Sequence, residues 1–342
     1  MSTIQTNAIV DAAGGNTATV NGQNITSSNT MGRNLIINGD FKVAQRGTSF
    51  TSDGYSLDRW YHQLSGGTST TSQQTFALGS EVAGCSKYLK QATSTGANYC
   101  GLVYKVEDVK SIHQGKVTFS FYAKGTNPAG GSFTVRLARI NTGTTFFDTP
   151  LNSTLTLTST WQRFVYTFDV ASFSGMGTID NTSQLYISIH QPAGDAGTAA
   201  WELNLTGVQL ENAEKVSTFD QRTYAEELTA CQRYCQVWAE SGDAVAFAGK
   251  GQGTTSIDFG WPLVVPLRAS PTISQTGTGW RAFRPAANLV ASTATAAVTR
   301  FGANHPFIAL RVGSFPSSSF NNNYAVNIGP HALSQFIFDS EL

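Results

Sequence analysis

The feature that most constrains this chain is a long series of strand-length apolar runs, each interrupted by Gly, Pro, Ser, Thr or Asn. The series begins at Asn34 and continues through most of the sequence. Two runs repeat large apolar residues with a period of two, at Val117, Phe119 and Phe121 and at Phe164, Tyr166 and Phe168. This period is typical of antiparallel strands with one buried face, because side chains alternate between the faces of a strand. About ten such runs over roughly 180 residues predict a β-sandwich of the jelly-roll type.

The chain has 342 residues, more than the roughly 100–200 of one ordinary domain. Residues 1–32 hold too few apolar side chains to form a core of their own, so we interpret them as an attachment arm. Residues 33–215 form the predicted jelly roll, and residues 216–238 a linker with one helix. Residues 239–342 contain further short runs separated by turns and predict a second, smaller β-sandwich domain. The expected fold class is therefore all-β.

One segment has the pattern of a helix. Thr223 and Glu226 have the spacing of a capping box, in which each side chain binds the backbone N–H of the other residue. An apolar stripe with helical spacing follows, at Tyr224, Leu228, Cys231, Cys235 and Trp238. The stripe predicts a helix that continues to the end of the segment and packs on a partner surface. That partner is the jelly roll, the second domain or the same helix in sister subunits, and the pattern does not choose among them.

The charge balance excludes several classes of partner. Charged residues make up 13% of the chain, against about 25% in a typical soluble protein. The 22 Lys and Arg residues equal the 22 Asp and Glu residues, so no basic footprint for nucleic acid is present. No stretch reaches the roughly 18 apolar residues of a membrane span, and the N-terminus lacks the pattern of a secretory signal. We expect a protein made in a cytosol that neither inserts into a membrane nor binds nucleic acid.

The four cysteines do not have the spacing of a metal or redox motif. On a helix, Cys231 and Cys235 would share one face with nearly parallel Cβ directions, which suits buried reduced thiols better than a disulfide. Cys85 and Cys100 flank a probable hairpin, and a bridge between them is the alternative that cytosolic folding disfavours.

An ordered series of motifs resembles a known family. The series starts with NLIINGDFKVAQRG (Asn34–Gly47) and GYSLDRWY (Gly54–Tyr61), and it continues through the strands to the helix. It looks like the jelly-roll modules of phage tail-fibre and carbohydrate-binding proteins. VPLRASPTIS (Val265–Ser274) and the final FDSEL are similar to the C-terminal domain of phage fibres. The resemblance implies a virion structural protein, usually a homotrimer, that is made in the host cytoplasm and binds a host-surface glycan or protein. It also implies that residues 1–32 contact other virion tail proteins.

Sugar-binding members of the family that this chain resembles often hold a structural calcium ion. Here Asp40 and Glu211 would be the ligands that the resemblance implies, but Lys42 stands where many relatives have Glu. Calcium needs about six to eight oxygen ligands, and the pattern supplies two side chains. We therefore predict no bound metal and no cofactor.

The residues do not assemble a catalytic pattern. Glycoside hydrolysis usually needs two carboxylates about 5–10 Å apart. Asp53 and Asp58 are close in sequence, but Asp58, Arg59 and Trp60 are better interpreted as a buried pair beside a core aromatic residue. The five histidines lack metal spacing, and no serine lies in a GxSxG elbow. We expect no enzyme, and a glycan depolymerase is the less favoured alternative.

Candidate binding residues lie in the turn-rich part of the second domain, where loops supported by a scaffold carry function. They are Trp280, Arg281, His305, Phe320 and Tyr324. Trp280 equally suits a plug at the end of the domain. The candidates for an oligomer interface are the helix residues Tyr224, Leu228, Cys231 and Cys235.

Two non-enzymatic functions fit these observations. The first is a tail-fibre adhesin that binds a receptor through its C-terminal domain. The second is a purely structural connector or capsid decoration protein. The separate turn-rich domain after the helix favours the adhesin, because a decoration protein would be expected to end in its docking surface.

Overall fold

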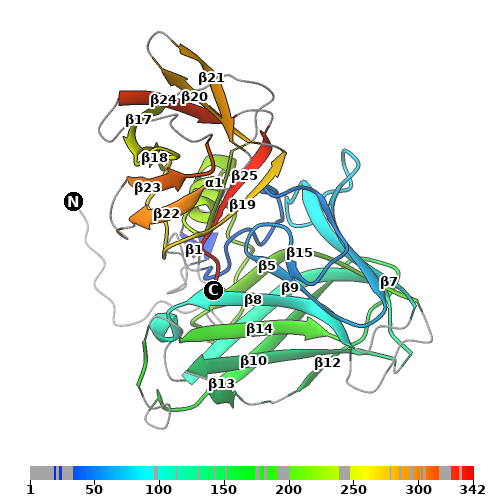
Figure 1. The fold of residues 1–342 in the computed structure, drawn as a ribbon. Helices are drawn as coiled ribbons and strands as arrows, with labels where there is room; N and C mark the ends of the chain where they lie inside the picture. The colour runs from blue at the N-terminus through cyan, green and yellow to red at the C-terminus, as the bar shows by residue number, and fades with distance from the viewer. Residues whose placement is uncertain are drawn as a thin grey trace.

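A computed structural model describes the fold (Figure 1). It describes residues 19–20, 23–24, 34–95, 99–112, 115–129, 131–141, 144–148, 150, 152–173, 178–180, 183–191, 200–238, 247–277, 279–284, 287–292, 296–300, 302, 306–315, 325–330 and 333–342. The short strands β1 (Thr19–Val20) and β2 (Gln23–Asn24) pair in an antiparallel manner.

The first unit is a sandwich of two antiparallel sheets, which confirms the predicted all-β fold and its jelly-roll β-sandwich. The seven-stranded sheet has the order β11 (Thr144–Phe147), β10 (Phe133–Asn141), β14 (Gln184–His190), β8 (Tyr99–Glu107), β5 (Trp60–Ser65) and β4 (Gly54–Tyr55), with β12 (Ser153–Leu155) also paired to β10. The six-stranded sheet has the order β13 (Gln162–Val170), β9 (Gly115–Thr126), β15 (Trp201–Glu211), β7 (Lys87–Thr95), β6 (Thr68–Thr75) and β3 (Ser49–Phe50). A short 3-10 helix, η1 (Val109–Ser111), follows β8.

The core of this sandwich follows from the period of two. Val117, Phe119 and Phe121 of β9 are fully buried, as the alternation predicts. On the edge strand β13, Phe168 is buried, while Phe164 and Tyr166 are half-buried and stack on Phe121 with ring centroids 5.8 and 5.9 Å apart. Every second side chain of these strands therefore points into the interior, and the side chains between them point outward.

The helix is shorter than the apolar stripe predicts. The capping box is confirmed, because Glu226 Oε2 accepts a hydrogen bond from Thr223 N at 2.8 Å and Glu226 N donates to Thr223 Oγ1 at 3.3 Å. However, α1 (Tyr224–Gln232) ends before Cys235, and β16 (Cys235–Trp238) pairs with β25 (Leu333–Asp339). The expected helix through Trp238 is wrong because hydrogen bonds to a strand about a hundred residues away in sequence outweigh a local periodicity.

The C-terminal unit also contains two antiparallel sheets. The three-stranded sheet has the order β16, β25 and β19 (Thr272–Gly277). The larger sheet has the order β21 (Ala287–Ser292), β20 (Trp280–Arg284), β24 (Ala325–Pro330), β17 (Phe247–Gln252), β18 (Ser256–Pro262), β23 (Phe307–Val312) and β22 (Ala297–Arg300). Aromatic rings fill the space between them: Trp261 lies 5.1 Å from Phe336, and Trp280 lies 5.4 Å from Phe336, between ring centroids. In Figure 1 this unit lies above the jelly roll.

Candidate functional site

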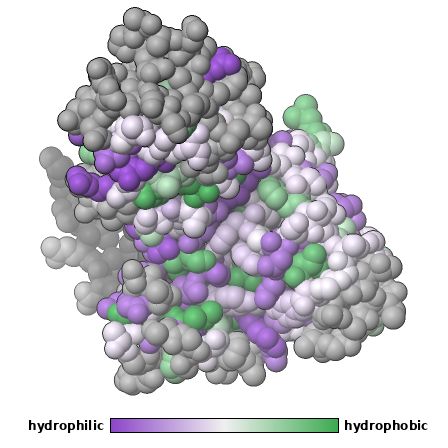
Figure 2. All heavy atoms as spheres, in the orientation of Figure 1, coloured by the Kyte–Doolittle hydropathy of each residue, from purple (hydrophilic) through white to green (hydrophobic). Residues whose placement is uncertain are grey.

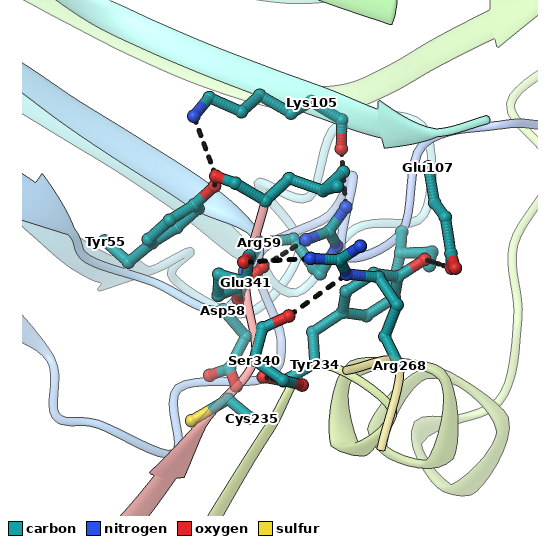
Figure 3. Close-up of polar contacts among 12 residues, drawn as sticks. Tyr55, Asp58, Arg59, Lys105, Glu107, Tyr234, Cys235, Arg268, Ser340 and Glu341 are labelled. Atoms are coloured by element: carbon teal, nitrogen blue, oxygen red, sulfur yellow. Dashed lines mark hydrogen bonds and ion pairs between the residues drawn. The ribbon is translucent and has the colours of Figure 1, made fainter. Parts of the chain in front are cut away.

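The last residues of the chain lie against the jelly roll in a buried polar cluster, which we call the C-terminal clasp (Figure 3). The Glu341 carboxylate accepts hydrogen bonds from Arg59 and, at 3.4 Å, from Arg46. The side chains of Arg59 and Glu341 are only 1% and 2% exposed. The Arg59 guanidinium also lies 3.5 Å from the centroid of the Tyr234 ring. This cluster therefore joins the jelly roll to the C-terminal unit by charges that are almost fully removed from water.

Backbone carbonyls of the same segment are bound as well. Tyr55 Oη and Lys105 Nζ donate to Leu342 O at 2.7 and 2.8 Å, and Arg268 Nε donates to Ser340 O at 3.1 Å. Burial lowers the pKa of Lys105, while Glu341 opposes that shift. The clasp is fully engaged in holding the two units together, which makes it a structural rather than a reactive cluster.

Asp58, one of the two carboxylates that lie close in sequence, is found beside the clasp (Figure 3). Asp58, Arg59 and Trp60 are all buried, as predicted. The carboxylate partner of Arg59, however, is Glu341, and Asp58 accepts instead from the backbone and side chain of Gln45, both at 2.6 Å. Burial raises the pKa of Asp58, and Arg46 and Gln45 oppose that rise.

The outer face of the seven-stranded sheet presents a different arrangement, set by strand register. One row across the strands runs Tyr61, Val103, Ser188 and Arg136. The adjacent row runs Gln63, Gly101, His190 and Thr134, and a third holds Lys105, Tyr186 and Ala138. Residues in one row point to the same side because each pair lies directly opposite in the ladder. Four strands thus bring together side chains that are up to 129 positions apart in sequence.

Small residues form the floor of this face, and large ones flank it. Gly101 has no room for a side chain, since a Cβ there would lie 2.5 Å from His190 Cβ. Val103, Ala138 and Ser188 are nearly fully buried, whereas the flanking Tyr61, Tyr99, Tyr186 and Arg136 are half-exposed. In Figure 2 the jelly roll carries hydrophilic and hydrophobic residues side by side, without one continuous apolar patch. We call this surface the tyrosine face.

The polar groups of the tyrosine face are held in place and uncharged, apart from two cations. The Tyr99 ring stacks on the His190 ring at 5.1 Å, and Ser188 Oγ lies 3.2 Å from His190 Nδ1. Burial, together with the positive charge of Arg136, lowers the pKa of His190 to about 4, so its ring is neutral near pH 7. Burial raises the pKa of Tyr99 and of Tyr186, which keeps both phenols protonated.

Two cations border the tyrosine face. Arg136 Nε donates to Asn152 Oδ1. Lys105 Nζ lies 5.6 Å from the centroid of the Tyr61 ring. The face therefore presents tyrosine rings with their hydroxyls, the Gln63 amide and one guanidinium, above the buried Ser188 and His190. Such a set can bind a ligand that offers both an apolar surface and several hydroxyl groups.

The binding residues expected from sequence lie elsewhere. Trp280 is fully buried and packs on Phe259 at 5.4 Å, so the hypothesis that it touches a receptor is corrected in favour of a core position. The reason is that β20 turns this side chain into the aromatic core of the C-terminal unit. Arg281, its neighbour, is half-buried. His305, Phe320 and Tyr324 lie outside the described residues.

The helix residues expected at an oligomer interface divide into two groups. Tyr224 is 57% exposed and Leu228 is partly exposed, so a trimer through them stays a prediction. Cys231 and Cys235 are fully buried within a single chain, so the premise that they need a partner subunit is wrong. All four cysteines are free and buried, in agreement with the interpretation of Cys231 and Cys235 as buried reduced thiols.

The residues that the family resemblance connects with calcium have other partners. Asp40 Oδ2 lies 2.6 Å from Lys42 Nζ, and Glu211 accepts from the backbone N of Ser217 at 3.2 Å and from its hydroxyl. Among the described residues, no group of three or more His, Cys, Asp or Glu side chains is placed to hold a metal ion. None of the described helices has the length and apolar character needed to cross a bilayer.

Sequence reasoning missed the tyrosine face because it assigned aromatic residues on strands to the core. A signal was nevertheless present in β14, where the polar residues Tyr186, Ser188 and His190 alternate with the apolar core residues Leu185, Ile187 and Ile189. The residues out of phase with the core positions are the ones that line the outer face.

Comparison with known proteins finds no matching family model and no matching curated protein. Solved structures to which this chain shows similarity include the tandem family 22 carbohydrate-binding modules of Paenibacillus barcinonensis Xyn10C, with 11% identity, a TM-score of 0.34, and coverage of 93% of this chain and 100% of that one. The family 11 module from Clostridium thermocellum has 15% identity, a TM-score of 0.32, and coverage of 49% and 98%. A domain of bacteriophage CBA120 tailspike protein 4 has 11% identity, a TM-score of 0.35, and coverage of 52% and 21%. Likenesses at this level do not assign a function or an origin to this chain.

Proposed function

We propose that this protein is a non-catalytic glycan-binding protein and that the tyrosine face of its jelly roll is the binding site. The observation that carries the proposal is the set of half-exposed rings of Tyr61, Tyr99 and Tyr186 around a floor of small residues, with neutral hydrogen-bonding groups between them. Sugars offer C–H groups to aromatic rings and hydroxyls to amides, phenols and guanidinium groups. Both the rings and the polar groups of the tyrosine face can therefore contact a sugar.

Each group has a distinct part in this proposal. Tyr61 and Tyr186 lie on either side of Val103 in adjacent rows and supply rings for stacking. Gln63, which accepts from Tyr186 Oη at 3.4 Å, supplies an amide. Arg136 supplies N–H donors to sugar oxygens, and the neutral His190 keeps Tyr99 in position.

The carboxylates that border the tyrosine face have structural partners. Asp53 accepts from Tyr61 Oη at 2.5 Å and from Leu64 N at 2.8 Å. Glu107 accepts from Arg233 at 2.9 Å and from Tyr234 at 2.7 Å. Because a hydrolase needs one carboxylate as acid and another as base or nucleophile at the scissile bond, these bound groups favour binding without turnover.

We further propose that the protein acts in a virion as a tail-fibre adhesin for a host-surface glycan, assembled as a homotrimer. The ordered motifs from Asn34 to the final FDSEL support this role, as do the low charge and the arm of residues 1–32. A connector or capsid decoration protein is the alternative. The purified protein labels host cells if it is an adhesin and leaves them unlabelled if it is only a connector.

The binding site is tested by affinity electrophoresis of the full chain in gels that contain soluble polysaccharides from the host surface. We expect retardation of the wild type and a loss of at least about tenfold in affinity for Tyr61→Ala/Tyr186→Ala, because ring stacking is worth about 1 kcal/mol or more at each position. Phe307→Ala is a matched control, since Phe307 is an exposed aromatic residue on β23, outside the face. Equal retardation of the double variant and the wild type would show that the tyrosine face is not the site.

A further inference from the structure

The opposite side of the jelly roll carries a second set of ligand-like groups. On the outer face of the six-stranded sheet, one row runs Thr126, Glu202, Ala92 and Thr70. The next row runs Lys124, Asn204, Lys90 and Ser72. The register places this surface on the far side of the sandwich from the tyrosine face, so the two surfaces share no residue.

A pocket of about 480 Å³ opens at the end of these strands, above the small side chain of Ala92. Its volume lies in the roughly 300–1,000 Å³ range of small-molecule sites. Hydroxyl groups dominate its outer walls, from Thr68, Thr70, Ser94 and Thr126. Thr68 and Ser94 hold each other by a hydrogen bond of 2.6 Å. A wall of hydroxyls can donate and accept, which suits another hydroxyl-rich molecule.

Ser69 and Thr93 also border the pocket, but their side chains face the sandwich interior. Both are 3% exposed, and their hydroxyls lie beside the Cys100 thiol of the core. The hydroxyls that a ligand can reach are therefore those on the outer face, from Thr68, Thr70, Ser94 and Thr126.

The rim of the pocket carries an ion pair. Lys90 Nζ lies 2.5 Å from Glu202 Oε2, and Asn204 Nδ2 donates to Glu202 Oε1 at 2.8 Å. The two charged side chains are 36% and 37% exposed, so a ligand can reach them. Because Lys90 and Glu202 neutralise each other, this pair gives no preference for an anionic or a cationic ligand.

An aromatic cluster lies farther along the same face. Trp161 lies 5.3 Å from Phe76 and 5.4 Å from Tyr88, measured between ring centroids, and all three side chains are half-exposed. Lys124 Nζ lies 5.4 Å from the Trp161 ring. Tyr88 and Ala92 are four residues apart on β7, a separation of roughly 13 Å along a strand. Pocket and aromatic cluster are therefore spaced for two or three linked pyranose rings.

We propose that the outer face of the six-stranded sheet is a second saccharide site, which holds one sugar of an uncharged oligosaccharide in the hydroxyl pocket and stacks neighbouring sugars on Trp161 and Tyr88. The jelly roll then binds glycans on both faces. Two such sites in one chain would hold a dense glycan surface more firmly than one, because the second contact is made at high effective concentration.

The experiment uses the full chain in which Tyr61→Ala/Tyr186→Ala removes the first site. Its probes are soluble neutral polysaccharides, namely a β-glucan, a galactomannan and a xylan, tested by affinity electrophoresis. We expect at least one probe to retard this protein. Adding Ala92→Tyr, which fills the pocket, should weaken the retardation at least tenfold, and adding Trp161→Ala should do the same by removing the stacking ring.

Leu78→Ala is the control, since Leu78 is 98% exposed and lies outside the site. Circular dichroism melting verifies that each variant is folded. Ala92→Tyr adds a side chain at the surface, so it still tests the pocket if Trp161→Ala does not fold. The proposal is wrong if no probe retards the Tyr61→Ala/Tyr186→Ala protein, or if folded Ala92→Tyr is retarded as strongly as its parent. A different result is expected if only the tyrosine face fails to bind glycan. The wild type and the Tyr61→Ala/Tyr186→Ala protein are then retarded equally, and adding Ala92→Tyr to either protein still weakens its retardation.

Discussion

Removal of the Glu341 carboxylate tests whether the C-terminal clasp stabilises the whole molecule. In Glu341→Ala, the Arg59 guanidinium, which is 1% exposed in the wild type, loses its only ion-pair partner among the described residues. An unpaired charge of this kind typically costs about 3–5 kcal/mol. Arg59 keeps a hydrogen bond to Lys105 O at 2.5 Å and its contact with the Tyr234 ring. We therefore expect a loss near the lower end, about 3 kcal/mol.

Urea unfolding followed by circular dichroism measures this loss, and thermal unfolding measures the same change. The unfolding entropy is about 2.1 cal/mol/K per residue, so a chain of 342 residues loses about 1.4 °C per kcal/mol and the melting temperature should fall by roughly 4 °C. The matched control is Asp169→Ala, which breaks the exposed pair of Lys116 and Asp169, with side chains 44% and 59% exposed. Exposed pairs contribute little to stability, because water and salt screen their charges. If Glu341→Ala destabilises the protein no more than Asp169→Ala does, the clasp does not have the stabilising role assigned to it.

Two further predictions concern pH and assembly. Burial lowers the pKa of two histidines, to about 4 for His190 and to a lower value than usual for His62. Both are neutral in the folded chain near pH 7, and both take up a proton near pH 6.5 when the chain unfolds. The unfolded state therefore binds more protons below pH 6.5, so stability should fall between pH 6.5 and 4, by up to about 3 kcal/mol for His190. Urea midpoints of the wild type and His190→Gln at pH 7 and pH 5 test this, and an equal pH 5 loss in both proteins contradicts it. For assembly, Leu228→Asp should weaken the expected homotrimer by burying a charge at the interface, and light scattering that reports a monomeric wild type at micromolar concentration rules out the trimer.

Local patterns were sufficient for the architecture. The period of two in Val117, Phe119 and Phe121 determined which side chains enter the sandwich, because a strand has only two faces. The pair of Thr223 and Glu226 determined where the helix begins, because a capping box involves residues only three positions apart. Both features depend on neighbours in sequence and so are visible without a structure.

Contacts between distant segments decided the rest. Cys235 to Trp238 have helical spacing but form a strand, because β25 offers a hydrogen-bonding edge that no local pattern announces. Arg59 is paired with Glu341, 282 positions away, rather than with the adjacent Asp58. The tyrosine face depends on the register of β5, β8, β14 and β10, which places Tyr61, Tyr186 and Arg136 on one surface. Sequence determines which face of its own strand a residue occupies, whereas only the pairing of whole strands determines which residues become its neighbours, because register is set by the packing of both sheets together.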